Sequence, residues 1–312
     1  MKNYYRIMLG SGAQFAEQCR AGGYVSIGFF GEYDLTDDLQ GPERAFREKY
    51  RPIRLAKHPK KGKIGAGLAC GVTLAVCKKL ETGDVVVCSN GKGEYLVGEI
   101  TGPYRYHPGT PTPHRRAVHW YDQLLEPNAM SSELRRSVGT SGTGGRLDKY
   151  AAELQALIVG NPSPSLIAVD PDVEDPATFA MEKHLEDFLV ANWAGTDLGK
   201  AFNIYADDEG NTGQQYETDT GRIDILAVSK DQKTILVVEL KKGRASDVVA
   251  GQIQRYMGFV LDELAEPDQA VHGAIVALED SSRIRRALRV TQNIDFYRYE
   301  VSFSLNKVVE GG

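Results

Sequence analysis

Two apolar segments near residue 230 carry charged residues where an aliphatic strand normally carries none. The first segment contains Asp224, and the second contains Glu239 and Lys241. Because residues two apart on a strand share a face, Glu239 and Lys241 point the same way, while Val238 and Leu240 point to the other side. Buried charges are costly without partners. A divalent metal ion shared with Asp224 would offset that cost, so the pattern predicts a metal-binding edge on a sheet.

Asp224 and Glu239 are the candidate metal ligands, and the backbone carbonyl of Leu240 is a third. Mg²⁺ can activate a water and neutralise charge on a scissile phosphate, so the predicted chemistry is phosphodiester hydrolysis. The ion prefers oxygen ligands and keeps several waters; Mn²⁺ is the expected substitute. Lys241 would orient the attacking water or stabilise the developing charge.

Three further residues are predicted to reach the same edge. Glu182 lies on a predicted helix, 178–193, that precedes the two strands. Gln252 and Tyr256 are four apart on another predicted helix. They therefore share one helical face and could position the substrate backbone.

The second half of the chain alternates helical and extended patterns. An antiparallel pair of strands followed by helices and further strands is typical of an α/β sandwich. The predicted strands are 222–228, 234–240, 272–278 and 295–301, and the predicted helices include 245–265 and 281–292.

The first half predicts a small mixed barrel or sheet with helices, so the fold class of the whole chain is α/β (α+β). Short strands alternate with helical segments, and Asn90-Gly91 is a strong hairpin signal. Proline and glycine become frequent after residue 126. The predicted organisation is an N-terminal domain at 1–126, a helical and Pro/Gly-rich linker at 127–177, and a C-terminal domain at 178–312.

Charge is distributed unevenly along the 312 residues. Residues 1–165 carry 22 basic and 16 acidic side chains, whereas residues 166–312 carry 15 and 26. Such asymmetry favours two modules with different tasks. The sequence contains no apolar run long enough to span a bilayer and no signal peptide, and its four cysteines are unevenly spaced. A cytoplasmic location is therefore expected.

The motifs of the second half resemble the PD-(D/E)xK nuclease superfamily, and in particular NucS-type DNA endonucleases and Mrr-like restriction endonucleases. The resemblance covers roughly residues 178–300. It implies a catalytic triad of Asp224, Glu239 and Lys241, an upstream helical glutamate at Glu182, with Glu186 one turn later on the same face, and a downstream Gln-x-x-x-Tyr motif. The matching runs are Gln215-Tyr216, Gly221-Arg222-Ile223-Asp224, Val238-Glu239-Leu240-Lys241 and Gln252-x-x-x-Tyr256.

The first 125 residues resemble a PUA/EVE-type domain. The resemblance rests on Gly-, Val- and Ile-rich runs such as 24–30, 83–87 and 97–104, and on His119-Trp120-Tyr121. It implies a β-barrel with a pocket for a modified, flipped-out base. Such a base is held by aromatic stacking and edge hydrogen bonds. Phe30, Tyr33 and Trp120 are the aromatic candidates and Asp34 could accept from an exocyclic amine; the alternative is that the aromatic residues belong to the barrel core.

A basic run between residues 51 and 63 has two interpretations. It is either a solvated face of the protein or a contact surface for DNA phosphates, and the neighbouring nuclease-like module favours the second. Its six cations are Arg51, Arg54, Lys57, Lys60, Lys61 and Lys63.

Three functional hypotheses follow. The first is a modification-dependent DNA endonuclease that restricts modified foreign DNA, uses Mg²⁺ and acts as a homodimer, because cutting both strands needs two sites. The second is a NucS-like repair endonuclease for mismatched or branched DNA. The third is a non-catalytic reader of modified nucleic acid, which the three clustered charges of the second half argue against.

Overall fold

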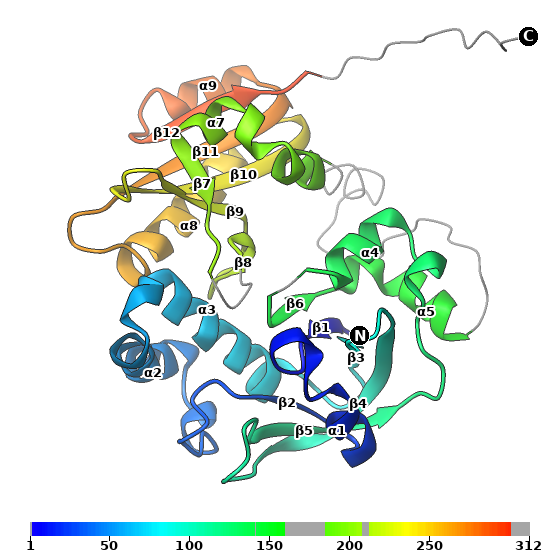
Figure 1. Ribbon diagram of the computed structural model, residues 1–312. Helices are drawn as coiled ribbons and strands as arrows, with labels where there is room; N and C mark the ends of the chain where they lie inside the picture. The colour runs from blue at the N-terminus through cyan, green and yellow to red at the C-terminus, as the bar shows by residue number, and fades with distance from the viewer. Residues whose placement is uncertain (1, 141, 160–184, 208–211, 301–312) are drawn as a thin grey trace, which may run out of the picture.

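The computed structural model describes residues 2–140, 142–159, 185–207 and 212–300. Over these residues the chain forms two six-stranded sheets, each with helices packed against it (Figure 1). Each sheet contains both parallel and antiparallel pairs. The mixed α/β fold class predicted from the sequence is confirmed.

The first sheet contains Tyr4–Ile7 (β1), Tyr24–Ile27 (β2), Val85–Ser89 (β3), Tyr95–Tyr106 (β4), His114–Trp120 (β5) and Gly144–Arg146 (β6). Its order is β2-β5-β4-β3-β1-β6, and β1 runs parallel to β3. Among the described strands, β2 and β6 form the two ends of this order. Of the barrel and the sheet that the sequence allows, the described strands form an open sheet, because β6 pairs with β1 and not with β2.

The connection between the parallel strands β1 and β3 contains strand β2 and three of the helices of the first half, and such long crossovers are usual for a parallel pair. The helices of the first half are Ala16–Gly22 (α1), Glu43–Lys57 (α2), Gly62–Leu74 (α3), Ser132–Val138 (α4) and Ala151–Val159 (α5). A π-helical turn, Ala75–Lys79, extends α3. Short 3-10 turns occupy Ser11–Ala13, Asp38–Gln40, Pro59–Lys61, Pro127–Ala129 and Asp148–Tyr150.

Residues 127–159, the first part of the predicted linker, pair with and pack against the first sheet. Strand β6 pairs with β1 in the register Tyr5↔Arg146. Leu134, Leu147 and Leu154 are each at most 1% exposed and pack in one cluster with residues of β1, β3 and β4. The segment is polar and glycine-rich in part, but its leucines cover one face of the sheet. The remaining predicted linker, 160–177, lies outside the described residues.

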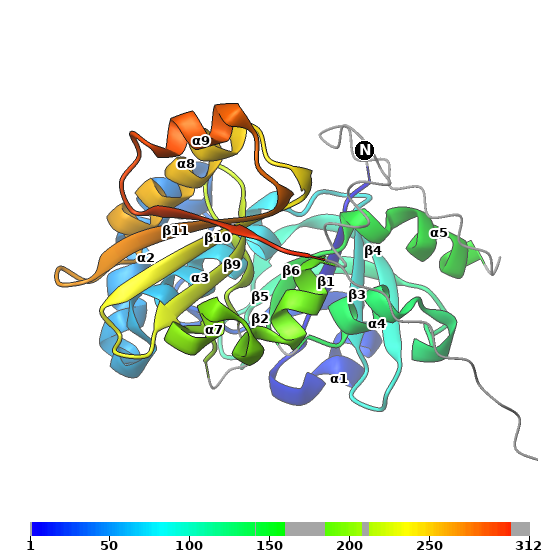
Figure 2. The ribbon, with the colours of Figure 1, turned by 90° about the horizontal axis from the view of Figure 1, so that it is seen from above.

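The second sheet contains Phe202–Ile204 (β7), Gln214–Glu217 (β8), Arg222–Ser229 (β9), Thr234–Arg244 (β10), Ala270–Glu279 (β11) and Ile294–Arg298 (β12). Its order is β12-β11-β10-β9-β7, and β8 also pairs with β9. Figure 2 shows the helices Val248–Glu263 (α8) and Ser282–Leu288 (α9) on one side and Asp197–Ala201 (α7) on the other. The helical residues 185–191 and the 3-10 turn Trp193–Gly195 complete this half.

Successive side chains of each strand point to opposite faces of the second sheet, and side chains are packed on both faces. Leu226 and Val237 pack toward the cluster that contains α8, whereas Ala227 and Val238 pack toward the cluster that contains Trp193. A strand buried on both faces is typical of a sheet covered by helices.

Helix α3 of the first half belongs to the core of the second half. Ile64 lies in the same cluster as Ile253 and Leu264, and Leu68 packs against it. The hydroxyl of Tyr216 donates to the Ile64 carbonyl at 3.4 Å. A Cβ on Gly67 would lie 2.5 Å from that hydroxyl. Glycine at this position therefore permits the close approach that joins the two halves.

Ion pairs reinforce the same interface. The basic run identified in the sequence spans the end of α2 and the start of α3, and it faces acidic residues of the second half. These contacts join Arg51 to Glu263, Lys61 to Asp207 (3.8 Å) and Lys63 to Glu266 (3.3 Å). The charge asymmetry of the chain is therefore partly an interface between its own halves.

The other cations of the basic run have different surroundings. Arg54 is 9% exposed and lies over the ring of Phe29, 5.0 Å from its centroid. Lys57 lies 2.7 Å from Glu32. Lys60 is exposed.

We predict that Gly67→Val lowers the unfolding temperature, whereas Gly71→Val on the same helix does not. A Cβ at Gly67 meets the Tyr216 hydroxyl and, at 2.8 Å, Leu264; at Gly71 it meets no atom of the described residues within 4 Å. Overpacking of this kind costs about 1–3 kcal/mol. Equal unfolding temperatures for the two variants would contradict the close packing of α3.

We predict that Arg51→Met destabilises the protein by roughly 3 kcal/mol, because it leaves Glu263, 16% exposed, without its guanidinium. Replacing both residues, Arg51→Met with Glu263→Met, recovers most of the loss, because it removes both buried charges. Lys60→Met, at an exposed position, is the control and shifts stability by less than about 0.5 kcal/mol. Chemical denaturation measures all three. A loss in Arg51→Met no larger than in the control would show that the pair does not hold the interface.

Candidate active site

The candidate site lies where β9 and β10 separate. The two strands pair from Ile235↔Val228 to Val238↔Ile225. Asp224 and Glu239 are the next residues on their strands. There the N–H of Leu240 donates to Oδ2 of Asp224 at 2.8 Å. The side chain of Asp224 on β9 thus accepts a hydrogen bond from the backbone of β10. The carboxylates of Asp224 and Glu239 therefore lie at the open end of the strand pair, where backbone pairing stops.

Glu239 and Lys241 lie side by side on β10. Nζ of Lys241 is 3.0 Å from Oε1 of Glu239. Glu239 is 2% exposed, whereas 31% of the Lys241 side chain is exposed. Strand β11 continues to pair with this part of β10, which holds both residues in an extended conformation. The ammonium group therefore reaches solvent beside a buried carboxylate.

A second carboxylate, Glu186, lies beside Asp224. Gln215 Nε2 donates to Glu186 Oε2 at 2.7 Å and to Asp224 Oδ1 at 3.1 Å. Gln214 Nε2 donates to Glu186 Oε1 at 2.5 Å. Two amides of β8 therefore hold the helical glutamate against the sheet.

The convergence of Gln214 and Gln215 requires an unusual backbone. Consecutive residues of a regular strand point to opposite faces. Gln215 has φ +52°, in the left-handed region that non-glycine residues rarely occupy. This turn lets both amides reach Glu186. A strained conformation that serves one polar cluster is typical of functional sites.

Burial raises the pKa of Asp224 to about 6, and the negative charge of Glu186 acts in the same direction. The Leu240 N–H, the Lys241 ammonium and the Gln215 amide oppose this shift. Adjacent carboxylates that resist ionisation are stabilised by an added cation.

Glu182, Gln252 and Tyr256 are predicted to lie near the carboxylates, and the structure describes the last two of them. Glu182 lies outside the described residues, and Glu186, one turn later on the predicted helix, is the glutamate observed beside Asp224. Gln252 Nε2 donates to the Tyr256 hydroxyl at 3.4 Å. Tyr256 is 4% exposed, and the charges of Glu239 and Asp224 help to raise its pKa, after burial. Both residues of the Gln-x-x-x-Tyr motif therefore lie near the carboxylates.

The donor set fits a hard divalent cation. Asp224, Glu239 and the Leu240 carbonyl offer oxygen atoms, which Mg²⁺ prefers. Within the described ranges, no three acidic, histidine or cysteine side chains form a ready metal cage. Mg²⁺ is usually bound by one or two carboxylates with waters and substrate phosphates, so a cage is not required.

The predicted base-pocket residues at the end of β2 are largely engaged within the protein. Phe30 is 8% exposed and packs against Tyr50, with 5.1 Å between ring centroids. Tyr33 is 37% exposed and also contacts Tyr50. Asp34 accepts hydrogen bonds from the N–H and hydroxyl of Thr36. Phe30 is thus a core residue.

The remaining candidate, Trp120, lies at the other end of the strand pair. Strand β2 pairs with β5 from Tyr24 to Ile27. Phe30 lies beyond Ile27, whereas Trp120 lies beyond the partner of Tyr24. The indole N–H of Trp120 donates to the Cys19 carbonyl at 3.1 Å. The structure therefore does not bring the four candidates into one pocket.

The chain resembles known proteins in two respects. Residues 5–141 match a family described as a domain of unknown function, DUF8426. A curated protein of Halobacterium salinarum, endonuclease NucS 2, is 27% identical over 215 residues, which is 67% of this chain and 71% of that protein. The chain is thus similar in sequence to a NucS-type endonuclease over about two thirds of its length.

Two solved structures are also similar. A repair endonuclease from Pyrococcus abyssi is 14% identical with a TM-score of 0.31, and the match covers 67% of this chain and 63% of that chain. The EndoMS–dsDNA2 complex is 14% identical with a TM-score of 0.31, covering 68% of this chain and 64% of that one. This chain therefore spans less than two thirds of each solved chain. No helix among the described residues is long and apolar enough to cross a membrane.

We predict that Asp224→Asn raises stability in metal-free buffer above pH 6 but not below pH 4. The folded-state pKa of about 6 lies above the unfolded value of about 3.9, so stability falls as pH rises through this window. Removing the charge of Asp224 is therefore expected to raise the free energy of unfolding by about 1–3 kcal/mol at pH 7.5. Asp268→Asn, at an exposed position between α8 and β11, is the control. Thermal unfolding from pH 3.5 to 8 measures both; parallel curves for wild type and Asp224→Asn would contradict the assignment.

Proposed function

We propose that this chain is a divalent-metal-dependent DNA endonuclease. The observation that carries the proposal is the cluster at the open end of β9 and β10, where Asp224 lies beside Glu186, and Glu239 lies beside Lys241. DNA as the substrate is supported by the homology to endonuclease NucS 2.

Each residue of the cluster has its own role in the proposed reaction. Asp224, Glu239 and the Leu240 carbonyl would hold Mg²⁺, which supplies an activated water and neutralises charge on the phosphate. Lys241, partly exposed and 3.0 Å from Glu239, donates to the attacking water or to a phosphate oxygen. Gln215 holds Asp224 and Glu186 in place. Gln252 and Tyr256 position the substrate backbone.

The favoured substrate is mismatched or branched DNA, as a repair endonuclease would cut. The sequence match is to endonuclease NucS 2, and the NucS-like hypothesis drawn from the sequence is the repair one, which favours this choice over restriction of modified DNA. The modified-base hypothesis depends on Phe30, Tyr33, Asp34 and Trp120. It is weakened because the ring of Phe30 packs against Tyr50 and the indole N–H of Trp120 donates to the Cys19 carbonyl. Phosphate contacts outside the site are proposed for Lys57 and Lys60, of which Lys60 is exposed and Lys57 is 56% exposed.

Cutting both strands with one site per chain would need two copies, so we propose a homodimer. Light scattering of the protein, with and without a mismatched duplex, measures the number of chains.

The test compares matched, mismatched, branched and cytosine-methylated duplexes in Mg²⁺, Mn²⁺ or a chelator. We expect cutting of the mismatched or branched substrate, none with chelator, and a loss of at least about 100-fold in Asp224→Ala and Lys241→Ala. Asp268→Ala and Lys230→Ala, both at exposed positions, are the matched controls and keep full activity.

Three results would contradict parts of this proposal. Undiminished cutting by Asp224→Ala would remove the catalytic assignment. Preference for the methylated duplex would move the function to restriction of modified DNA. Absence of cutting on every substrate with either metal would favour a non-catalytic reader.

A further inference from the structure

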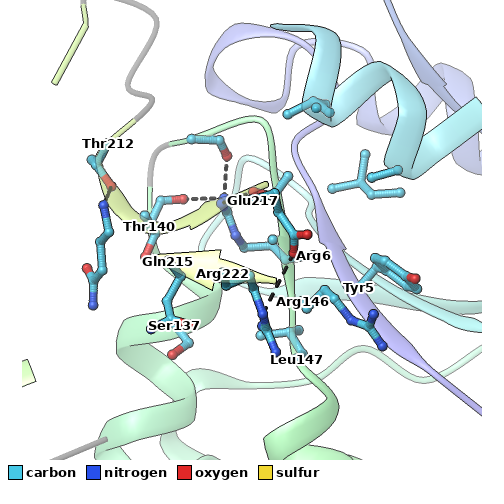
Figure 3. Close-up of a pocket in the computed structure, with 18 of the residues that line it drawn as sticks. Tyr5, Arg6, Ser137, Thr140, Arg146, Leu147, Thr212, Gln215, Glu217 and Arg222 are labelled. Carbon is cyan, nitrogen blue, oxygen red and sulfur yellow. Dashed lines mark hydrogen bonds and ion pairs between the residues drawn. The ribbon is translucent and has the colours of Figure 1, made fainter. Parts of the chain in front are cut away.

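A cavity of about 140 Å³ lies between the two halves of the chain. The first half lines the cavity with residues of β1, β6, α3 and α4. The second half lines it with residues of β8 and β9. Figure 3 shows how residues from these elements line it. The cavity thus exists only because the two halves pack together.

One wall of the cavity is apolar, and the cavity as a whole has the volume of about one flat ring. Leu68 and Val72 of α3 line it, together with Ile7 and Leu147. Gly71 lies between them on the helix, and a Cβ there would meet none of the described atoms within 4 Å. A cavity of about 150 Å³ is enough to hold benzene. An aromatic ring of one nucleobase therefore fits the space over Gly71.

The rest of the lining is strongly cationic. Among the described lining residues, five are basic (Arg6, Arg136, Arg146, Lys149 and Arg222) and two are acidic (Asp187 and Glu217). A lining with this balance favours an anionic group.

Within the part of the chain that the structure describes, two of these arginines form only long ion pairs. Arg136 is 3.5 Å from Asp187, and Arg222 is 3.9 Å from Glu217. Charge-assisted hydrogen bonds are about 2.7–2.9 Å long, so these pairs are loose. Each guanidinium carries five N–H donors in a fork that suits a phosphate.

Arg6 adds a buried positive charge beneath the cavity. It is 5% exposed, and its guanidinium donates to the carbonyl oxygens of Thr140, Gly142 and Gly144 in the glycine-rich loop after α4. Among the described residues no carboxylate pairs with it. Burial lowers its pKa to about 10. A buried cation without a counter-charge is costly, and an anion in the adjoining cavity would offset that cost.

We propose that this cavity binds a single nucleotide, with its base over Gly71 between Leu68 and Val72 and its phosphate between Arg136 and Arg222. Ser137 and Thr140 offer hydroxyl groups to the base edge or sugar. The occupant is either a free nucleotide or one unstacked nucleotide of a strand. The site stands independently of whether Asp224 cuts DNA.

A nucleotide in the cavity would lie one side chain away from the carboxylate cluster. Gln214 and Gln215 line the cavity, and the same two amides hold Glu186 and Asp224. An occupant that bonds to either amide would therefore affect how the carboxylates are held.

The test is titration calorimetry of the metal-free, full-length protein with four probes: dAMP, deoxyadenosine, inorganic phosphate and a single-stranded hexanucleotide. Gly71→Leu fills the cavity from a position with open space. Gly258→Leu is the matched control, since Gly258 is also helical, is exposed and has open space around an added Cβ. Arg136→Ala removes a side chain that is 58% exposed, so we expect this variant to fold like wild type.

We expect dAMP or the hexanucleotide to bind wild type and Gly258→Leu equally, and to bind Gly71→Leu at least 10-fold more weakly. Arg136→Ala weakens binding of dAMP or the hexanucleotide but not of deoxyadenosine. Binding of dAMP assigns the site to free nucleotides, and binding of the hexanucleotide alone assigns it to a strand. Absence of binding by all probes, undiminished binding by Gly71→Leu, or phosphate binding as tight as that of dAMP would overturn the proposal.

Discussion

The hydrogen bond from the Leu240 N–H to the Asp224 carboxylate is the contact on which the candidate site depends. It occurs where β9 and β10 stop pairing, so it opens the sheet and fixes Asp224 at the opening. Strand β11 keeps β10 extended on the other side, which leaves Glu239 and Lys241 on one face. The same opening lets Gln215 join Asp224 to Glu186. The carboxylate oxygens thus lie at the open end of β9 and β10, in a sheet whose two faces stay packed.

The first half of the chain supports this site through α3. Ile64 and Leu68 extend the core beneath α8, and Tyr216 of β8 donates to the start of α3. Strand β8 also carries Gln214 and Gln215. A shift of α3 relative to the second sheet would therefore be transmitted to the amides that hold the carboxylates. This arrangement gives the first half a role in positioning the site, beside any contact it makes with DNA.

Strand periodicity predicts that Glu239 and Lys241 share one face of a strand, as the structure shows, but it does not predict what surrounds them. Asp224, Glu239 and Lys241 interrupt aliphatic runs, and alternation fixes their sides. The pairing of β6 could not be predicted, because Gly144-Gly145-Arg146 carries no strand pattern. The convergence of Gln214 and Gln215 depends on one left-handed residue. The role of Arg51 depends on Glu263, 212 residues away, which only the tertiary structure brings near. Local patterns therefore locate charged residues but do not identify their partners.

Binding of Mn²⁺ measured by electron paramagnetic resonance tests the central claim most directly, because it does not depend on the choice of DNA substrate. We expect one class of bound ion in wild type and in Asp268→Asn, and a large loss of Mn²⁺ affinity in both Asp224→Asn and Glu239→Gln. Equal affinity in all four proteins would contradict a metal site at the open end of β9 and β10.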